Sequence, residues 1–140
     1  MGLDQSIHII KNYPDLKNFY GKEDKDYESF SLLDDIVEDA PFDFYKDYAV
    51  QQFMFELAQK NGGIKEHGEF YATPLRITLD DLRKLYALTA EQLTKLAKRW
   101  TKNAWPYDDH DVERIHSLCH QIAGYIAFDD EYAAYFDSDW

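Results

Sequence analysis

The sequence has few of the residues that would define an unusual architecture. Its single cysteine, Cys119, excludes an internal disulfide framework and is typical of a reducing compartment. No apolar run approaches the ~18 residues of a membrane span. The first residues also lack the basic segment followed by an apolar segment that is typical of a signal peptide. No repeat, low-complexity tract or linker divides the 140 residues. We therefore expect residues 1–140 to form a single domain, cytoplasmic and without membrane association.

Motifs that identify a reaction are also missing. The chain has no P-loop, no Gly-x-Gly-x-x-Gly, no Gly-x-Ser-x-Gly and no Cys-x-x-Cys. Paired carboxylates do occur, but each pair is adjacent in sequence and falls near a predicted helix end or in a loop, where capping or solvation explains it: Asp34/Asp35, Asp80/Asp81, Asp108/Asp109 and Asp129/Asp130. We predict no catalytic residue and no cofactor, so a non-catalytic role is favoured over an enzyme.

Apolar periodicity predicts a helix-dominated α+β fold with a small sheet of two or three strands. Thr78 can cap one helix, and Thr89-Ala90-Glu91-Gln92 is a capping box that opens the next. The predicted helices are 30–39, 44–60, 79–87, 89–103 and 109–128, and an acidic, aromatic tail ends the chain. The predicted strands are 6–11, 69–73 and 76–77.

The last predicted helix carries one narrow apolar seam, formed by Val112, Ile115, Cys119, Ile122 and Ile126. Cys119 lies in that seam, which indicates a small buried hydrophobic residue, not a reactive thiol.

Beside the seam, Glu113, His116 and His120 fall within about 60° of one another on a helix that turns ~100° per residue. A Glu-x-x-His-x-x-x-His array of this kind can hold a divalent metal through imidazole and carboxylate groups. It provides the alternative hypothesis, a metal-binding protein or metal-dependent enzyme. No second ligand cluster is identifiable elsewhere.

The net charge of −12 is unevenly distributed. Residues 1–44 hold eleven Asp and Glu against four Lys, a net charge of −7, and residues 104–140 hold nine against Arg114 alone, a net charge of −8. The middle, 45–103, holds seven acidic against ten basic residues, a net charge of +3. The acidity therefore belongs to the two ends of the chain.

Two interpretations of this charge remain open. In the first, it only keeps the domain soluble and monomeric. In the second, both ends lie on one face, where rows of carboxylates resemble a phosphate backbone and attract a basic, nucleic-acid-binding surface of another protein. Exposed aromatic residues would supply contact energy around that face. The expected partner-binding residues are Asp34, Asp35, Glu38, Asp39, Asp129, Asp130, Glu131, Asp137 and Asp139.

A basic cluster near the end of the 89–103 helix favours a different function, direct binding of nucleic acid. Basic residues interleaved with aromatics can bind single-stranded nucleic acid. It comprises Lys95, Lys98, Arg99 and Lys102 around Trp100 and Trp105. Trp100, however, shares the apolar face of this helix with Leu93, Leu96 and Ala97, so we expect it in the core and the basic residues on the solvated side. Direct nucleic-acid binding is not expected.

Two short motifs resemble a family of small proteins common in bacteriophage genomes. The opening Met1-Gly2-Leu3-Asp4 is similar to the family's Met-Gly-Leu-Asp-Met-Tyr, although Gln5-Ser6 departs from it. Gly68-Glu69-Phe70-Tyr71, ahead of Leu79-Asp80-Asp81-Leu82-Arg83-Lys84-Leu85, is similar to its Gly-Glu-Tyr-Tyr-Val before a Leu-rich helix. The aromatic-rich helix between these motifs is matched by Phe44-Tyr45-Lys46 through Asn61, and the last fifty residues have no counterpart.

No activity is established for this family, so the resemblance assigns no functional residue to this chain. The resemblance implies a phage or prophage accessory protein in the cytoplasm of a bacterial host. Such proteins often bind host proteins, including restriction, CRISPR and other defence components. The sequence thus favours an inhibitor that binds a host protein with a basic surface, with DNA mimicry as one mechanism that the charge allows.

Overall fold

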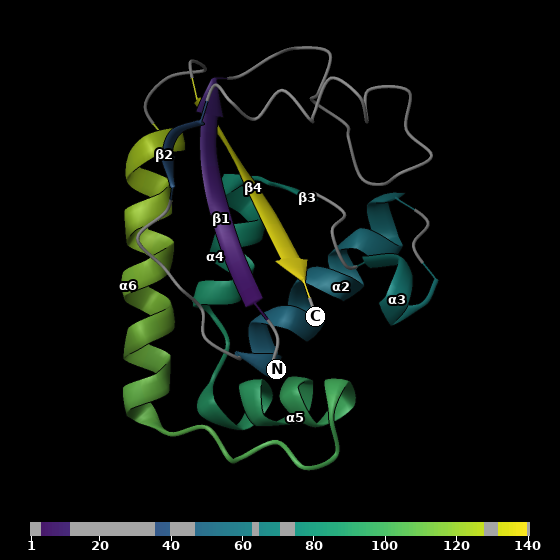
Figure 1. The fold of residues 1–140 in the computed structure, drawn as a ribbon. Helices are drawn as coiled ribbons and strands as arrows, with labels where there is room; N and C mark the ends of the chain where they lie inside the picture. Colours follow the sequence, from purple (N-terminus) through teal and green to yellow (C-terminus); the bar gives the residue numbers. More distant parts are fainter. Residues whose placement is uncertain are drawn as a thin grey trace.

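The strands from the two ends of the chain pair with each other. The computed structural model describes residues 4–11, 36–39, 47–62, 65–70, 75–127 and 132–139. Its strands are β1 (Asp4–Lys11), β2 (Ile36–Asp39), β3 (Leu75–Ile77) and β4 (Tyr132–Asp139). They form one antiparallel sheet in the order β2-β1-β4-β3 (Figure 1).

Helices supply the larger part of the fold. They are α2 (Tyr48–Gly62), α3 (His67–Phe70), α4 (Leu79–Tyr86), α5 (Ala90–Trp100) and α6 (Asp109–Ile126). Capping boxes begin α4 at Thr78, α5 at Thr89 and α6 at Asp108, where each side chain accepts the backbone N–H three residues later. The predicted helix-dominated α+β class is confirmed.

One face of the sheet joins the helical core. The β1 residues Gln5, Ile7 and Ile9 are buried and stand opposite Ser138, Phe136 and Ala134 of β4. Leu75 and Ile77 of β3 extend the same layer, which packs on residues of α2, α4, α5 and α6. In Figure 1 the sheet lies in front of α2 and α4. Ala133 and Tyr135, on the other face, are also buried, so the middle of β4 is shielded from solvent on both sides.

Local signals predicted most elements well. The strand at 6–11, the short strand at 76–77 and the helices at 44–60, 79–87, 89–103 and 109–128 are confirmed within the described residues, with ends shifted by a few positions. Cys119 is 3% exposed within the predicted seam of α6, and Trp100 packs against the core as expected.

Two predictions are wrong and one strand was not predicted, each because a distant partner decides the local structure. Residues 36–39 form β2 instead of the end of a helix, since they pair with β1; residues 30–35 lie outside the described ranges. Of the predicted strand at 69–73, residues 69 and 70 belong to α3 and 71–73 lie outside the described ranges; the buried Phe70 ring stacks on Phe136 at 5.9 Å. The expected acidic tail contains β4, an interior strand of the sheet. The predicted small sheet therefore contains two of its expected strands, β1 and β3, joined by β4 between them and by β2 at one edge.

A buried polar network ties these elements together at Asp47, whose side chain is 0% exposed. The Asp47 carboxylate accepts hydrogen bonds from the Val50 backbone N–H and the Tyr107 hydroxyl, and its second oxygen lies 3.0 Å from Nη2 of Arg114. Gln5 of β1 accepts from the Asp47 N–H at 2.8 Å and donates to the Asp47 carbonyl at 2.9 Å. The network therefore links β1, α2, α6 and the segment between α5 and α6.

Gln51 extends the network to the C-terminal strand. Its side-chain carbonyl accepts from Gln5 at 2.9 Å, and its amide donates to the Ser138 hydroxyl at 2.9 Å. All three side chains are buried, and each polar contact offsets part of the cost of removing an amide or hydroxyl from water. The two terminal strands are thus joined to α2 by side chains as well as to each other by backbone.

None of the helices in the described ranges combines the length and the apolar character needed to cross a membrane.

Replacing Tyr107 by Phe tests the network. The Tyr107 hydroxyl donates to Asp47 and accepts from the Ala49 N–H at 3.0 Å, so its loss leaves two buried groups with one partner fewer. We expect Tyr107→Phe to lower the free energy of unfolding by about 1–3 kcal/mol. Urea denaturation followed by circular dichroism measures this. Tyr86→Phe, which removes a hydroxyl from a side chain that is 40% exposed, is the control and should change stability by less than about 0.5 kcal/mol. Equal effects of the two substitutions would contradict the role of the network.

Candidate functional site

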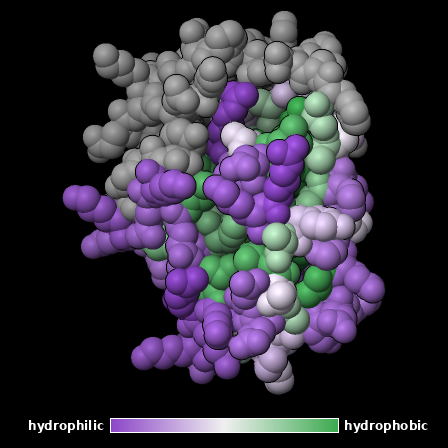
Figure 2. Space-filling view, turned by 180° about the vertical axis from the view of Figure 1, so that it is seen from behind, coloured by the Kyte–Doolittle hydropathy of each residue, from purple (hydrophilic) through white to green (hydrophobic). Residues whose placement is uncertain are grey.

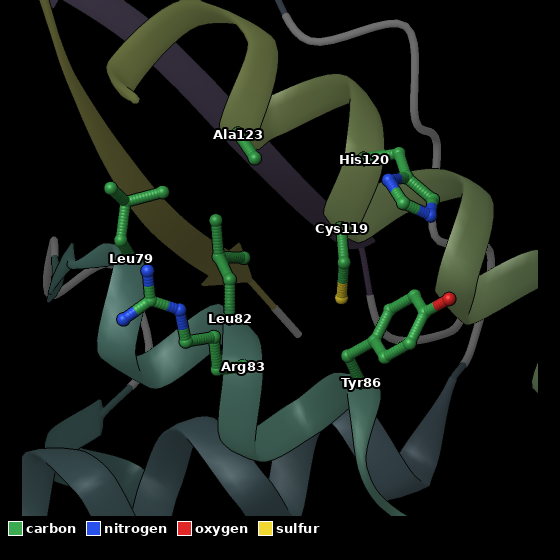
Figure 3. A pocket seen from close by; sticks show the side chains of 7 residues that line it. All are labelled: Leu79, Leu82, Arg83, Tyr86, Cys119, His120 and Ala123. Carbon is green, nitrogen blue, oxygen red and sulfur yellow. The ribbon is translucent and has the colours of Figure 1, made fainter. Parts of the chain in front are cut away.

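A pocket of about 240 Å³ opens between α4 and α6 (Figure 3). The two helices meet because Leu82 and Leu85 of α4 and Ile115, Leu118 and Ile122 of α6 are buried in the same core. The lining residues are Leu79, Leu82, Arg83, Tyr86, Cys119, His120 and Ala123. Most of them are apolar, so the pocket suits a hydrophobic group better than a charged substrate.

Tyr86 forms the aromatic wall of this pocket. Its ring stacks on His116 with 3.9 Å between centroids and meets the edge of His120 at 5.2 Å. His116 Nε2 is also 2.8 Å from the backbone carbonyl oxygen of Tyr86, so this imidazole donates a hydrogen bond that joins the two helices. His116 therefore has a structural role at the end of α4.

The Cys119 side chain is directed toward α4 between Leu82 and Tyr86 (Figure 3). Burial raises the pKa of the Cys119 thiol to about 12. A thiol with a raised pKa is protonated at neutral pH and is a poor nucleophile. The pocket thus lacks an activated nucleophile, although Cys119 contributes to its wall.

The metal array predicted on α6 is not assembled as a binding site. Glu113, His116 and His120 are all among the described residues, and in the described part of the chain no three His, Cys, Asp or Glu side chains are grouped so that they could hold a metal ion. His116 already donates to the Tyr86 carbonyl, while Glu113 and His120 are exposed. The spacing on the helix brought the three residues to one side, but tertiary contacts turn His116 toward α4.

The nine acidic residues predicted to bind a partner lie only partly within the described chain. Asp34, Asp35, Asp129, Asp130 and Glu131 are outside it. The backbone of the other four belongs to the sheet: Glu38 and Asp39 to β2, and Asp137 and Asp139 to β4.

The register brings these acid-bearing strands together. Asp139 pairs with Asp4, Asp137 with Ser6, and Asp39 with His8 across neighbouring strands. Since residues directly opposite each other share a face of a sheet, Asp4, Asp39, Asp137 and Asp139 occupy positions of the same face. Asp137 itself is half-buried, so it presents less of its carboxylate to a partner than the sequence suggested.

The most exposed large apolar side chain in the described residues is Trp105, at 86%. It lies between α5 and α6, ahead of the exposed carboxylates Asp108, Asp109 and Glu113. We call Trp105, Asp108, Asp109 and Glu113 the Trp105 patch. Asp109 and Glu113 are one helical turn apart, about 5–6 Å between Cβ atoms. The hydrogen bond from the Asp111 N–H holds the pKa of Asp108 below its usual value, so this carboxylate remains charged.

Sequence reasoning did not identify this patch, although a signal was present. Trp105 precedes Pro106 and falls outside the apolar stripes of both neighbouring helices, so no helix buries it. Asp108 and Asp109 fall at a predicted helix end, where capping or solvation is enough to explain them.

A second hollow, of about 370 Å³, has the opposite electrostatic character. It lies where α2, α4 and α5 meet, and we call it the basic groove. Figure 2 shows the helical side of the molecule, where hydrophobic residues are visible between hydrophilic side chains. The groove is lined by Phe53, Glu56, Leu57, Lys60, Lys84, Leu88, Gln92, Lys95, Leu96 and Arg99.

Comparison of the chain with protein-family models, with curated proteins and with solved structures found no match. The functional interpretation therefore depends on the surfaces and the pocket described above.

The Cys119 thiol gives a direct test of the α4–α6 packing, because the chain has one cysteine. A pKa of about 12 instead of 9.0 reduces the thiolate fraction near pH 8 about a thousandfold, and burial blocks access as well. We expect a charged disulfide reagent such as Ellman's reagent to label the native protein at least ~100-fold more slowly than the protein in guanidinium chloride. Rapid, stoichiometric labelling of the native protein would show that α4 does not cover Cys119.

Proposed function

We propose that this protein is a non-catalytic binding protein that docks on a basic surface of a bacterial host protein through an acidic surface containing an exposed tryptophan. The observation that carries the proposal is the 86% exposure of Trp105, which precedes the exposed carboxylates Asp108, Asp109 and Glu113 in the chain. Tryptophan is among the residues most enriched at the energetic centres of protein interfaces, and exposing its ring to water is otherwise unfavourable.

Charge supplies the second part of the recognition. A net charge of −12 steers the protein toward positively charged surfaces and raises the association rate at low salt. The antiparallel pairing of β1 with β4, and of β2 with β1, also brings Asp positions from both ends of the chain to one face of the sheet, where they add to the negative potential. The Trp105 patch would give contact energy and specificity, while the wider acidic surface would guide the encounter.

The partner is a protein that ordinarily binds nucleic acid. Two carboxylates one helical turn apart, Asp109 and Glu113, can occupy cationic subsites that serve phosphates, so the protein would act as a nucleic-acid mimic. The resemblance to phage proteins favours a cytoplasmic host factor in defence or nucleic-acid processing. Direct nucleic-acid binding is disfavoured, because the net negative charge repels a polyanion. No observation favours the metal-dependent alternative.

Affinity capture from bacterial lysate with matched variants tests the proposal. The immobilised wild type should retain a host protein at about 50 mM salt and release most of it at about 500 mM salt. Trp105→Ala should weaken the purified complex about tenfold or more, since it removes the central apolar contact. Asp109→Asn/Glu113→Gln should slow association and reduce the salt dependence. Binding is measured by surface plasmon resonance.

The controls carry the same chemistry on other surfaces. Tyr86→Ala removes a different exposed aromatic ring, and Asp80→Asn/Glu91→Gln removes two exposed carboxylates of α4 and α5. Neither should change the affinity more than twofold. A partner that binds the Trp105→Ala variant as tightly as the wild type would contradict the proposal. If duplex DNA fails to compete with the complex, the mimic mechanism is wrong even though the interface stands.

A further inference from the structure

The basic groove has an apolar floor and a cationic rim. Phe53 and Leu57 of α2, with Leu88 and Leu96, form the floor; Phe53, Leu57 and Leu88 are only half-buried, so part of this apolar surface faces solvent. The lining residues include four cations and one carboxylate, Glu56, while Asp80 and Glu91 lie beside two of the cations; the cations are Lys60, Lys84, Lys95 and Arg99. This is an unusual surface on a chain with 27 acidic and 15 basic residues, because it concentrates four of the fifteen.

The groove has the length of a short helical contact. α2 lines it with Phe53, Leu57 and Lys60, and α5 lines it with residues from Gln92 to Arg99. Seven residues of α-helix rise about 10 Å, so each wall extends over nearly two turns. Side chains at i, i+3 or i+4, and i+7 of an added helix would meet such a floor, which is the usual way an amphipathic helix occupies a groove between two others.

The cations on the rim are available to a partner. Lys84 pairs with Asp80 at 3.2 Å, Lys95 with Glu91 at 3.6 Å, and Arg99 with Glu56 at 3.3 Å. The Lys84 and Lys95 pairs are largely exposed and the Arg99 pair is partly exposed; because exposed pairs contribute little to stability, carboxylates of a partner can replace them at small cost. Among the ion pairs of the described residues, none involves Lys60, which lies in the last turn of α2.

We infer that the basic groove binds an acidic amphipathic helix of a partner protein, with its apolar side chains on the floor and its Asp or Glu residues against Lys60, Lys84, Lys95 and Arg99. Charge complementarity selects this occupant. An extended nucleic acid is a poorer fit, because the floor offers three Leu side chains and only one aromatic ring for base stacking, and because the net charge of −12 repels a long polyanion.

The site is distinct from the Trp105 patch and opposite in charge. A domain with both surfaces can bind a basic protein through one and an acidic helix through the other. It would thus bridge two proteins instead of only blocking one, which goes beyond the function proposed above.

A fluorescein-labelled, 18-residue helical peptide with Leu at i, i+3, i+4 and i+7 and Glu on both flanks of that stripe is the probe. Fluorescence anisotropy at about 50 mM salt should show saturable binding to the full chain. The Lys60→Glu/Lys95→Glu variant should bind this peptide at least tenfold more weakly. The matched control is Lys98→Glu/Lys102→Glu, which changes the net charge equally at two exposed residues outside the groove, and it should stay within twofold of the wild type. Circular dichroism verifies that both variants fold.

Charge exchange makes the test specific. A peptide with Lys in place of every Glu should bind the Lys60→Glu/Lys95→Glu variant more tightly than the wild type. The inference is overturned if the wild type binds the two peptides equally, if both double variants weaken binding to the same degree, or if an oligodeoxythymidine of equal charge binds more tightly than the Glu peptide. Trp105→Ala should leave peptide binding unchanged, so failure at the Trp105 patch and failure at the groove are distinguishable.

Discussion

The buried Asp47 carboxylate is the interaction on which the arrangement of the described elements depends. A carboxylate with no exposed surface is stable only if hydrogen bonds and an opposite charge replace its water shell. Here Val50, Tyr107 and Arg114 do so, and Gln5 completes the set at the Asp47 backbone. Because these partners come from α2, the α5–α6 segment, α6 and β1, moving any one of them leaves a buried polar group without its partner.

This constraint connects the core to the proposed binding surfaces. Tyr107 is two residues from Trp105, so its bond to Asp47 fixes the segment that presents the tryptophan. The Tyr107 N–H also donates to the Thr94 hydroxyl of α5 at 2.8 Å, which joins the same segment to a wall of the basic groove. Burial, followed by the charge of Asp47, raises the pKa of Tyr107, so the phenol keeps its proton in neutral solution. The hydrogen bonds of Tyr107 therefore link the Trp105 patch to the basic groove, so one domain presents both surfaces to two partners of opposite charge.

Much of this fold could be predicted from local sequence, and little of the candidate site could. Thr78, Thr89 and Asp108 cap α4, α5 and α6 through neighbours three residues away, so sequence indicated where these helices begin. β4 was missed because its partner β1 lies at the other end of the chain, and only that pairing turns an acidic, aromatic segment into an interior strand. The basic groove was missed because its cations come from three helices, of which the sequence grouped only Lys95 and Arg99. The metal hypothesis had the same weakness, since it used spacing along one helix only. That spacing does not reveal that His116 donates a hydrogen bond to the Tyr86 carbonyl of α4.

Hydrogen–deuterium exchange of Asp47→Asn against the wild type tests the central claim most directly, namely that Asp47 fixes the segment carrying Trp105. Asparagine keeps the shape of the side chain but loses the negative charge, and one of the two acceptor oxygens, which serve Arg114 and the Tyr107 hydroxyl, is replaced by an NH2 group. The account predicts that protected amides of residues 101–108 and of the first turns of α6 exchange at least tenfold faster in the variant, while those of α4 change much less. Unchanged exchange in residues 101–108, or the same acceleration throughout the protein, would contradict it.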